Sequence, residues 1–113
     1  MSRRVILKVY GHIRPVSDEL YAVLDKICAG AIADGQDEPV LQRENETARI
    51  SFEGMYFPVE EILMALAPHL GPEHKGRLDV LDIENWRLTR HVFDGGLRAH
   101  SASLNNVLDY AGL

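Results

Sequence analysis

The sequence predicts an α+β fold, a two-layer sandwich in which helices cover one face of a mainly antiparallel sheet. Segments with apolar residues at every second position alternate with segments whose apolar residues recur at three- and four-residue steps, the periods of strands and helices. These segments follow the order βαββαβββα. The first six have the order of a ferredoxin-like plait, extended by a C-terminal hairpin and a short helix. With 113 residues, 46% of them hydrophobic, the chain suits a single domain over residues 1–113.

The first expected strand covers residues 4–14, where the two faces differ in polarity. Its apolar face holds Val5, Leu7, Val9 and Ile13. Its other face holds Ile6, Lys8, Tyr10, His12 and Arg14. This alternation is typical of a strand buried on one side, and Pro15 marks its end.

Residues 16–35 predict the first helix. Ser17 is the expected N-cap, and Asp18 and Glu19 follow in the first turn, where the helix dipole favours negative charge. Gly35 is the expected stop. The apolar stripe consists of Leu20, Val23, Leu24, Ile27 and Ala31.

Residues 39–44 and 48–57 predict two short antiparallel strands, joined by a tight turn at residues 45–47. Residues 58–70 then predict the second helix, which Pro68 should end by excluding the helical conformation before it. Its buried stripe consists of Val59, Ile62, Leu63 and Leu66.

The last part of the chain predicts a further strand, a hairpin and a helix. Residues 78–83 fit either a strand buried on both faces or a short helix, and their β-branched content and short length favour the strand. Residues 85–93 and 97–102 predict the hairpin. Residues 103–112 predict a short helix whose first residue is the N-cap.

The loop at residues 94–96 sets the expected register of this hairpin. A three-residue loop with a left-handed glycine pairs Arg90 with His100 and places His91 on the opposite face, so the two histidines do not share a metal. The other expected pairs are Phe93 with Leu97, Val92 with Arg98, and Trp86 with Leu104. A two-glycine loop would bring the histidines together but would lose the apolar pairs, so we disfavour it.

The composition limits the classes of function. A formal net charge of -5 disfavours binding to nucleic acid, which normally needs excess positive charge. No apolar run approaches the roughly 20 residues of a membrane span, and no secretory signal is visible, so we expect a cytoplasmic protein without membrane contact. The single cysteine, Cys28, lies on the apolar side of the first helix and is expected to be buried and unreactive.

No motif for a metal, a cofactor or catalysis stands out. His69 and His74 are five residues apart, which is not the spacing of helical zinc ligands. Asp79, Asp82 and Glu84 form an acidic run that lacks the calcium-loop pattern, and these carboxylates are expected to be solvated or to cap a turn. We therefore expect no metal and no cofactor, and the sequence favours a protein that is not an enzyme.

The hairpin carries the candidate site. Trp86, Arg90 and His100 share one face in the expected register, and Tyr10 and His12 lie on the polar face of the first strand. Our first hypothesis is a non-enzymatic interaction module, an adaptor, regulator or inhibitor. It would bind a protein partner or a second copy of itself, because Trp and Arg anchor many interfaces. The same pattern also suits a purely structural hairpin, since arginine stems often cover an aromatic ring.

Two alternatives rest on other features. A small-molecule binder or small enzyme would have a pocket floored by the sheet and lined by Tyr10, His12, Arg90 and His100. This alternative requires the four side chains to share one face and to lie near one another. An acidic mimic of nucleic acid is the third hypothesis, and it requires one contiguous face of carboxylates.

Overall fold

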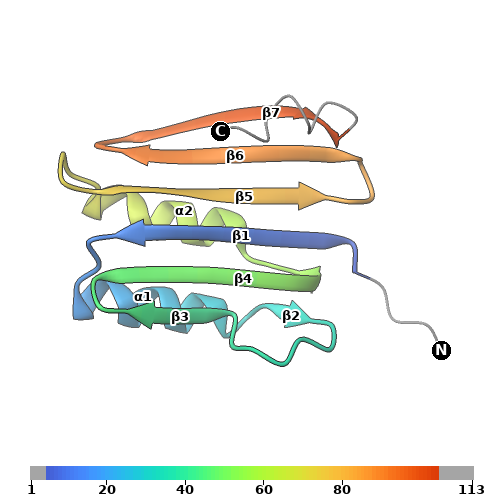
Figure 1. The fold of residues 1–113 in the computed structure, drawn as a ribbon, viewed down its shortest axis with the longest axis horizontal. Coiled ribbons are helices and arrows are strands. Elements are labelled where there is room, and N and C mark those ends of the chain that lie inside the picture. Colours follow the sequence, from blue (N-terminus) through green and yellow to red (C-terminus); the bar gives the residue numbers. More distant parts are fainter. Residues whose placement is uncertain (1–4, 105–113) are drawn as a thin grey trace.

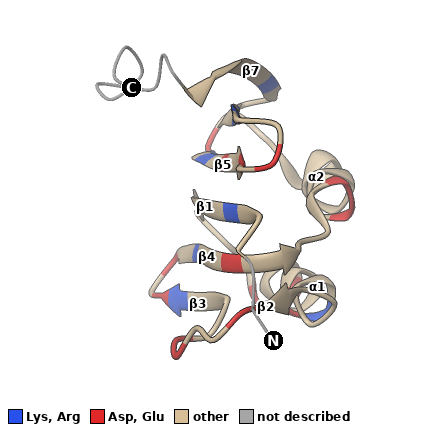
Figure 2. Ribbon diagram, turned by 90° about the vertical axis from the view of Figure 1, so that its right-hand side faces the viewer, with Lys and Arg blue, Asp and Glu red and all other residues tan. Residues whose placement is uncertain are grey.

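A computed structural model describes residues 5–104 as a sheet with two helices on one of its faces (Figure 1, Figure 2). The strands are β1 (Leu7–Arg14), β2 (Ile32–Ala33), β3 (Leu41–Glu44), β4 (Thr47–Tyr56), β5 (Lys75–Asp82), β6 (Arg87–Asp94) and β7 (Leu97–Ser103). The helices are α1 (Asp18–Cys28) and α2 (Val59–Leu66), and α2 continues into the 3-10 turn η1 (Ala67–His69). The predicted α+β class, with an antiparallel sheet and helices on one face, is therefore confirmed.

The seven strands form one antiparallel sheet in the order β2–β4–β1–β5–β6–β7, with β3 also paired to β4. Helix α1 lies between β1 and β3 in the chain, and those strands are separated in the sheet by β4. Helix α2 connects β4 to β5, which are separated by β1. The predicted element order lacked the short strand β2, and the ferredoxin-like description stays a prediction.

The core lies between the sheet and the helices, where the alternation of the strands places it. Val9 faces Phe52 on β4 and Val80 on β5, so the apolar face of β1 points at the helices, as the sequence predicted. The largest fully buried side chains are Phe52, Leu20, Leu24, Ile62, Leu78 and Val9. Burying one side chain of this size contributes about 1.5–3 kcal/mol, and the whole set fixes which face of the sheet is left open.

Helix α1 begins as predicted but ends earlier. The Ser17 side chain accepts a hydrogen bond from the Leu20 amide at 3.1 Å, which is the predicted N-cap. The helix ends at Cys28 and not near Gly35, so that end of the prediction was wrong. The chain leaves the helix early because Ile32 and Ala33 pair with the part of β4 that extends beyond β3.

Strand β5 begins before the predicted segment, at Lys75. Its strand conformation confirms the choice of a strand for residues 78–82, and Ile83, the last residue of the predicted segment, lies in the turn that follows. A Cβ on Gly76 would lie 2.2 Å from the backbone oxygen of His12, so β1 and β5 approach here only because this residue is glycine.

The terminal hairpin has the predicted register. Arg90 pairs with His100, and His91 pairs with Ala99, so the two histidines point to opposite faces. The left-handed residue of the loop is Gly95, with φ of 73°. The predicted helix at residues 103–112 lies outside the described residues, apart from Ser103, which ends β7, and the residue after it.

No helix within residues 5–104 has the length and the apolar character needed to cross a membrane.

Candidate functional site

The face of the sheet opposite the helices carries the candidate site, and we call it the open face. Figure 1 looks directly onto it, and Figure 2 shows that α1 and α2 both lie on the other side. The side chains of every second strand residue point to this face, starting with Lys8, Tyr10, His12 and Arg14 of β1. Neither helix covers these side chains, so the polar face predicted for the first strand is the face that points away from the helices.

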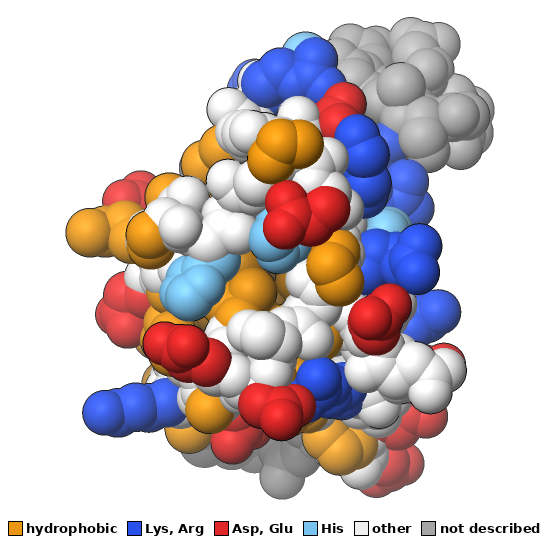
Figure 3. Space-filling view, turned by 90° about the vertical axis from the view of Figure 1, so that its left-hand side faces the viewer, with side chains coloured by type: hydrophobic (Ala, Val, Ile, Leu, Met, Phe, Trp, Pro, Cys, Tyr) orange, Lys and Arg blue, Asp and Glu red, His pale blue; other side chains and the backbone are white. Residues whose placement is uncertain are grey.

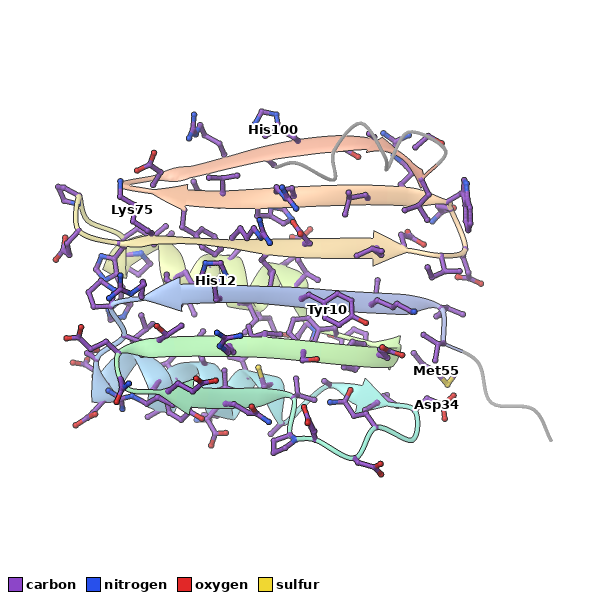
Figure 4. All side chains as sticks on the ribbon, viewed as in Figure 1. Tyr10, His12, Asp34, Met55, Lys75 and His100 are labelled. Carbon is purple, nitrogen blue, oxygen red and sulfur yellow. The ribbon has the colours of Figure 1, made fainter. Side chains whose placement is uncertain are left out.

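The register aligns four of the five predicted site residues on this face. Tyr10 pairs with Asp79, Asp79 pairs with Arg90, and Arg90 pairs with His100, so one row crosses four neighbouring strands. His12 is two residues from Tyr10 and therefore lies on the same face, in the next row, as Figure 4 shows. Of the two conditions that the small-molecule hypothesis required, the shared face is met. The second, that the four side chains lie near one another, is met by the pair Arg90 and His100 and not by Tyr10 and His100, which β5 and β6 separate.

Trp86, the fifth predicted residue, lies apart from this row. It is in the turn between β5 and β6, with φ of 54° and an exposed fraction of 50%. Its backbone oxygen accepts a hydrogen bond from the Leu104 amide at 2.9 Å, in agreement with the predicted register. Trp86 therefore lies at the turn that precedes β6, whereas Arg90 and His100 pair in the middle of β6 and β7.

Arg90 is bound to Asp79 by two parallel hydrogen bonds. Its Nε and Nη2 atoms donate to the two carboxylate oxygens at 2.7 and 2.8 Å. The exposed fractions of the two side chains are only 12% and 14%. The hydrogen bond to Asp79 raises the pKa of Arg90, and a bidentate pair of this kind holds both planar groups in fixed positions.

Tyr10 is fixed in the same way by a carboxylate from the neighbouring strand. Its hydroxyl donates to Oε2 of Glu53 at 2.6 Å. Burial, followed by the hydrogen bond to Glu53, raises the pKa of Tyr10 to about 12. The Tyr10 hydroxyl is therefore protonated at neutral pH, and Tyr10 adds no negative charge to the site.

His12 lies between two arginines. It pairs with Arg49 on β4 at one side and with Arg77 on β5 at the other. Burial lowers the pKa of His12, the positive charges of Arg77 and Arg49 lower it further, and Asp79 acts in the opposite direction. The positive charges of the two arginines therefore make protonation of the His12 imidazole less favourable.

Two hollows adjoin His12 on the open face. The first, about 400 Å³, lies over β4, β1 and the segment that leads into β3, and we call it the polar hollow. Its lining includes Tyr10, His12, Glu38, Gln42, Glu44, Arg49, Ser51, Arg77 and Asp79. The second, about 380 Å³, lies over β1, β5 and the hairpin, and we call it the hairpin hollow. Its lining consists of His12, Gly76, Arg77, Arg90, Val92 and His100.

Basic side chains outnumber acidic ones on the open face. In the end view of Figure 3, blue side chains gather along the right-hand edge, which is the open face seen from its side. The basic residues of this face are Lys8, Arg14, Arg49, Lys75, Arg77, Arg90 and Arg98, and its acidic residues are Glu44, Glu53, Asp79 and Asp94. The strand residues of this face thus carry an excess of three positive charges, which Glu38 at the rim of the polar hollow reduces to two, although the chain as a whole has a net charge of -5.

Sequence reasoning missed the residues that surround His12. Arg49 and Arg77 were not singled out. Asp79 was expected to be solvated or to cap a turn, but it is bound to Arg90. Alternation within each strand does contain this information, but neighbouring strands must be placed in order before their side chains can be combined. The sequence reveals which residues share a strand face and conceals which strands lie side by side.

The other residues that the sequence brought up do not form a second site. His74 lies in the loop before β5, and its Nδ1 accepts a hydrogen bond from the Gly71 amide at 3.0 Å. Among residues 5–104 there is no group of three or more His, Cys, Asp or Glu side chains that could hold a metal. Cys28 is buried, and burial raises the pKa of its thiol to about 11, which disfavours the reactive thiolate.

No family model, no curated protein and no solved structure matches this chain.

Proposed function

We propose that this chain is a binding module without catalytic activity, and that it holds a small molecule on the open face of its sheet. One observation carries the proposal. Tyr10, His12, Arg90 and His100, which were singled out from the sequence, lie on one face and line two hollows that share His12 and Arg77. Convergent polar groups around a hollow are the usual mark of a ligand site.

The size and the rigidity of the hollows support a small ligand. Each has a volume of about 400 or 380 Å³, within the range of roughly 300–1,000 Å³ that is typical of small-molecule sites. Their floor is a sheet, and the Arg90–Asp79 and Tyr10–Glu53 contacts hold the side chains that line them. A pre-formed site of this kind loses little free energy to ordering when the ligand binds.

A protein partner, our first hypothesis from the sequence, becomes the second candidate. Trp86 supports it, because a half-exposed tryptophan is a typical interface anchor. Arg90 supports it less, because its guanidinium already binds Asp79. A symmetric dimer through the open face would bring two basic surfaces together, and an acidic mimic of nucleic acid would need carboxylates where this face has an excess of basic residues.

The test is to fill the polar hollow without disturbing the core. Ser51 is exposed, lines this hollow and pairs with Tyr10, so Ser51→Trp would occupy the space that the ligand needs. Thr47→Trp is the matched control, because Thr47 lies on the same face of β4 but lines neither hollow. The measurement is a screen of neutral and charged small molecules by amide chemical-shift changes in the wild type and both variants.

The expected result is a set of compounds that shift the amides around His12 in the wild type and in Thr47→Trp but not in Ser51→Trp. If no compound shifts these amides, the small-molecule function is refuted. If Ser51→Trp binds the compounds as the wild type does, the open face is not the site. A purified protein that protects the open face from hydrogen exchange, in place of any small molecule, would favour the second candidate.

A further inference from the structure

The row of three side chains centred on His12 has the composition of an anion site. Arg49, His12 and Arg77 lie directly opposite one another on three adjacent strands, β4, β1 and β5. Neighbouring strands are about 4.8 Å apart, so the bases of these side chains are spaced closely enough to contact one bound group. All three line the polar hollow, and two of them also line the hairpin hollow.

The carboxylates nearest this row leave it with a positive potential. Asp79 accepts both hydrogen bonds from Arg90, and its contact with Nε of Arg77 is longer, at 3.8 Å. Glu53 accepts the hydrogen bond from Tyr10. Burial lowers the pKa of His12 most, and the positive charges of Arg77 and Arg49 lower it further, which agrees with the basic surroundings that the register gives this residue.

Two acidic residues at the rim of the polar hollow would compete with a bound anion for the positive charges of the row. Glu44 contacts Nε of Arg49 at 3.3 Å, and Glu38 also lines the hollow. The exposed fractions of the Arg49 and Glu44 side chains are 60% and 64%, and an ion pair as exposed as this contributes little free energy. An incoming anion can therefore replace Glu44 as the partner of Arg49 at small cost.

From this arrangement we infer that Arg49, His12 and Arg77 bind the oxyanion group of the ligand, a carboxylate or a phosphate, at the boundary of the two hollows. The inference rests on the proposed function and specifies the chemical class of its ligand. Guanidinium groups bind such oxyanions through pairs of parallel hydrogen bonds. The uncharged part of the ligand extends over Ser51 and Gln42 in the polar hollow, or over Val92 in the hairpin hollow.

The experiment compares pairs of probes that differ only in the anionic group. Adenosine monophosphate is compared with adenosine, benzoate with benzyl alcohol, and inorganic phosphate is measured alone. Binding is followed by the His12 side-chain resonances and by calorimetry at constant ionic strength. A preference for the phosphate pair or the carboxylate pair identifies which of the two groups the site takes.

The variants separate the site from the general charge of the face. Arg77→Gln and Arg49→Gln each remove a charged fork, and each is expected to weaken the anionic probe about ten- to a hundredfold. Arg98→Gln is the matched control, because it removes the same charge in the same row, on β7, where it lines neither hollow. Its affinity is expected to stay within about threefold of the wild type, because Arg98 is exposed and lies two strands beyond Arg77, about one screening length away at 0.1 M salt.

Three outcomes would overturn the inference. The first is binding of adenosine and benzyl alcohol as tightly as their anionic partners. In that case the small-molecule function survives and the anion assignment falls. The second is an equal loss of affinity in Arg98→Gln and Arg77→Gln, which would mean diffuse attraction without a site. The third is the absence of any shift at His12 with every probe, charged or neutral, which would remove the proposed function as well.

Discussion

The pKa of His91 depends on how this residue is packed in the sheet. It lies on the helix side of β6, is partly buried and pairs with Ala99 and with Leu78. Burial lowers its pKa, and the charge of Asp79 only partly opposes this effect. His12 on the open face also has a lowered pKa, so the folded chain resists protonation of both side chains.

The stability of the fold should therefore decrease in mild acid. Below about pH 6.5 an unfolded chain protonates its histidines, while the folded chain does not do so until its lower pKa is reached. The unfolded state binds more protons in this window, so the free energy of unfolding falls as the pH falls, by at most about 1.4 kcal/mol per pH unit for one group. Urea denaturation at a series of pH values from 7.5 to 5 measures the slope.

The variant His91→Gln should reduce this slope, because it removes one of the two groups that cause it. His100→Gln, on the exposed strand β7, controls for the mere loss of an imidazole. The explanation fails if the wild type is equally stable across the range, or if His91→Gln keeps the full slope.

The sequence predicted which residues belong to the site better than it predicted which of them contact one another. Tyr10 and His12 were placed on one face by alternation alone, and the hairpin loop placed Arg90 opposite His100. The contact between Arg90 and Asp79 was not predicted, because it depends on β5 lying beside β6 in one particular register. Contacts within a strand or a hairpin follow from local rules, whereas contacts between separate segments require the topology.

At the scale of the elements, the close approach of β1 and β5 determines where His12 meets Arg77. This approach depends on Gly76, because a side chain there would collide with the backbone of His12 and Ile13. A Cβ on Gly96, in the hairpin loop, would meet no atom within 4 Å, so this position is free of the constraint. The two glycines thus have different roles although both lie in or beside β-structure.

Gly76→Ala should therefore destabilise the protein by about 1–3 kcal/mol, the usual cost of forcing extra volume into a well-packed region. Gly96→Ala should change the free energy of unfolding by no more than about 0.5 kcal/mol, as is usual for an exposed position. The midpoints of urea unfolding measure both effects, provided that the slope m is unchanged. Equal midpoints for the two variants would show that the strands can move apart at little cost.

The elements that sequence reasoning placed incorrectly are those whose limits depend on distant pairing. The apolar stripe was extended beyond Cys28 because the helical period continues to Ala31. The chain instead forms β2, since the end of β4 offers an unpaired edge and Gly54 lets the backbone of Ile32 approach closely. Local propensity cannot indicate this edge, because the strand that provides it lies about 20 residues further along the chain.

At the scale of the whole molecule, charge is separated between the open face and the rest of the protein. Outside that face the described residues include only three basic ones, Lys26, Arg43 and Arg87. The acidic ones are Asp18, Glu19, Asp25, Asp34, Asp37, Glu46, Glu60, Glu61, Glu73, Asp82 and Glu84. A protein with a net charge of -5 therefore presents a basic surface on one side, which the total composition did not reveal.

This separation predicts an unusual dependence on salt. At 0.01 M salt the screening length is about 30 Å, longer than the 22 Å shortest extent of the molecule, so an anionic surface is repelled by the net charge. At 0.1 M the screening length is about 10 Å, and the surface responds mainly to the basic face nearest to it. Retention on a sulfonate resin at pH 7 should therefore be weak at 0.01 M, greatest near 0.1 M, and lost again near 1 M.

Two double variants with the same net charge separate this effect from total charge. Arg49→Gln with Arg98→Gln removes two charges from the open face, and should abolish the maximum near 0.1 M. Lys26→Gln with Arg87→Gln removes two charges from other parts of the molecule, and should keep it. Retention that only decreases from the lowest salt upwards, or that changes equally in both variants, would contradict a localised basic face. A maximum that depends on Arg49 and Arg98 alone would mean that position, and not net charge, determines which molecules this protein attracts.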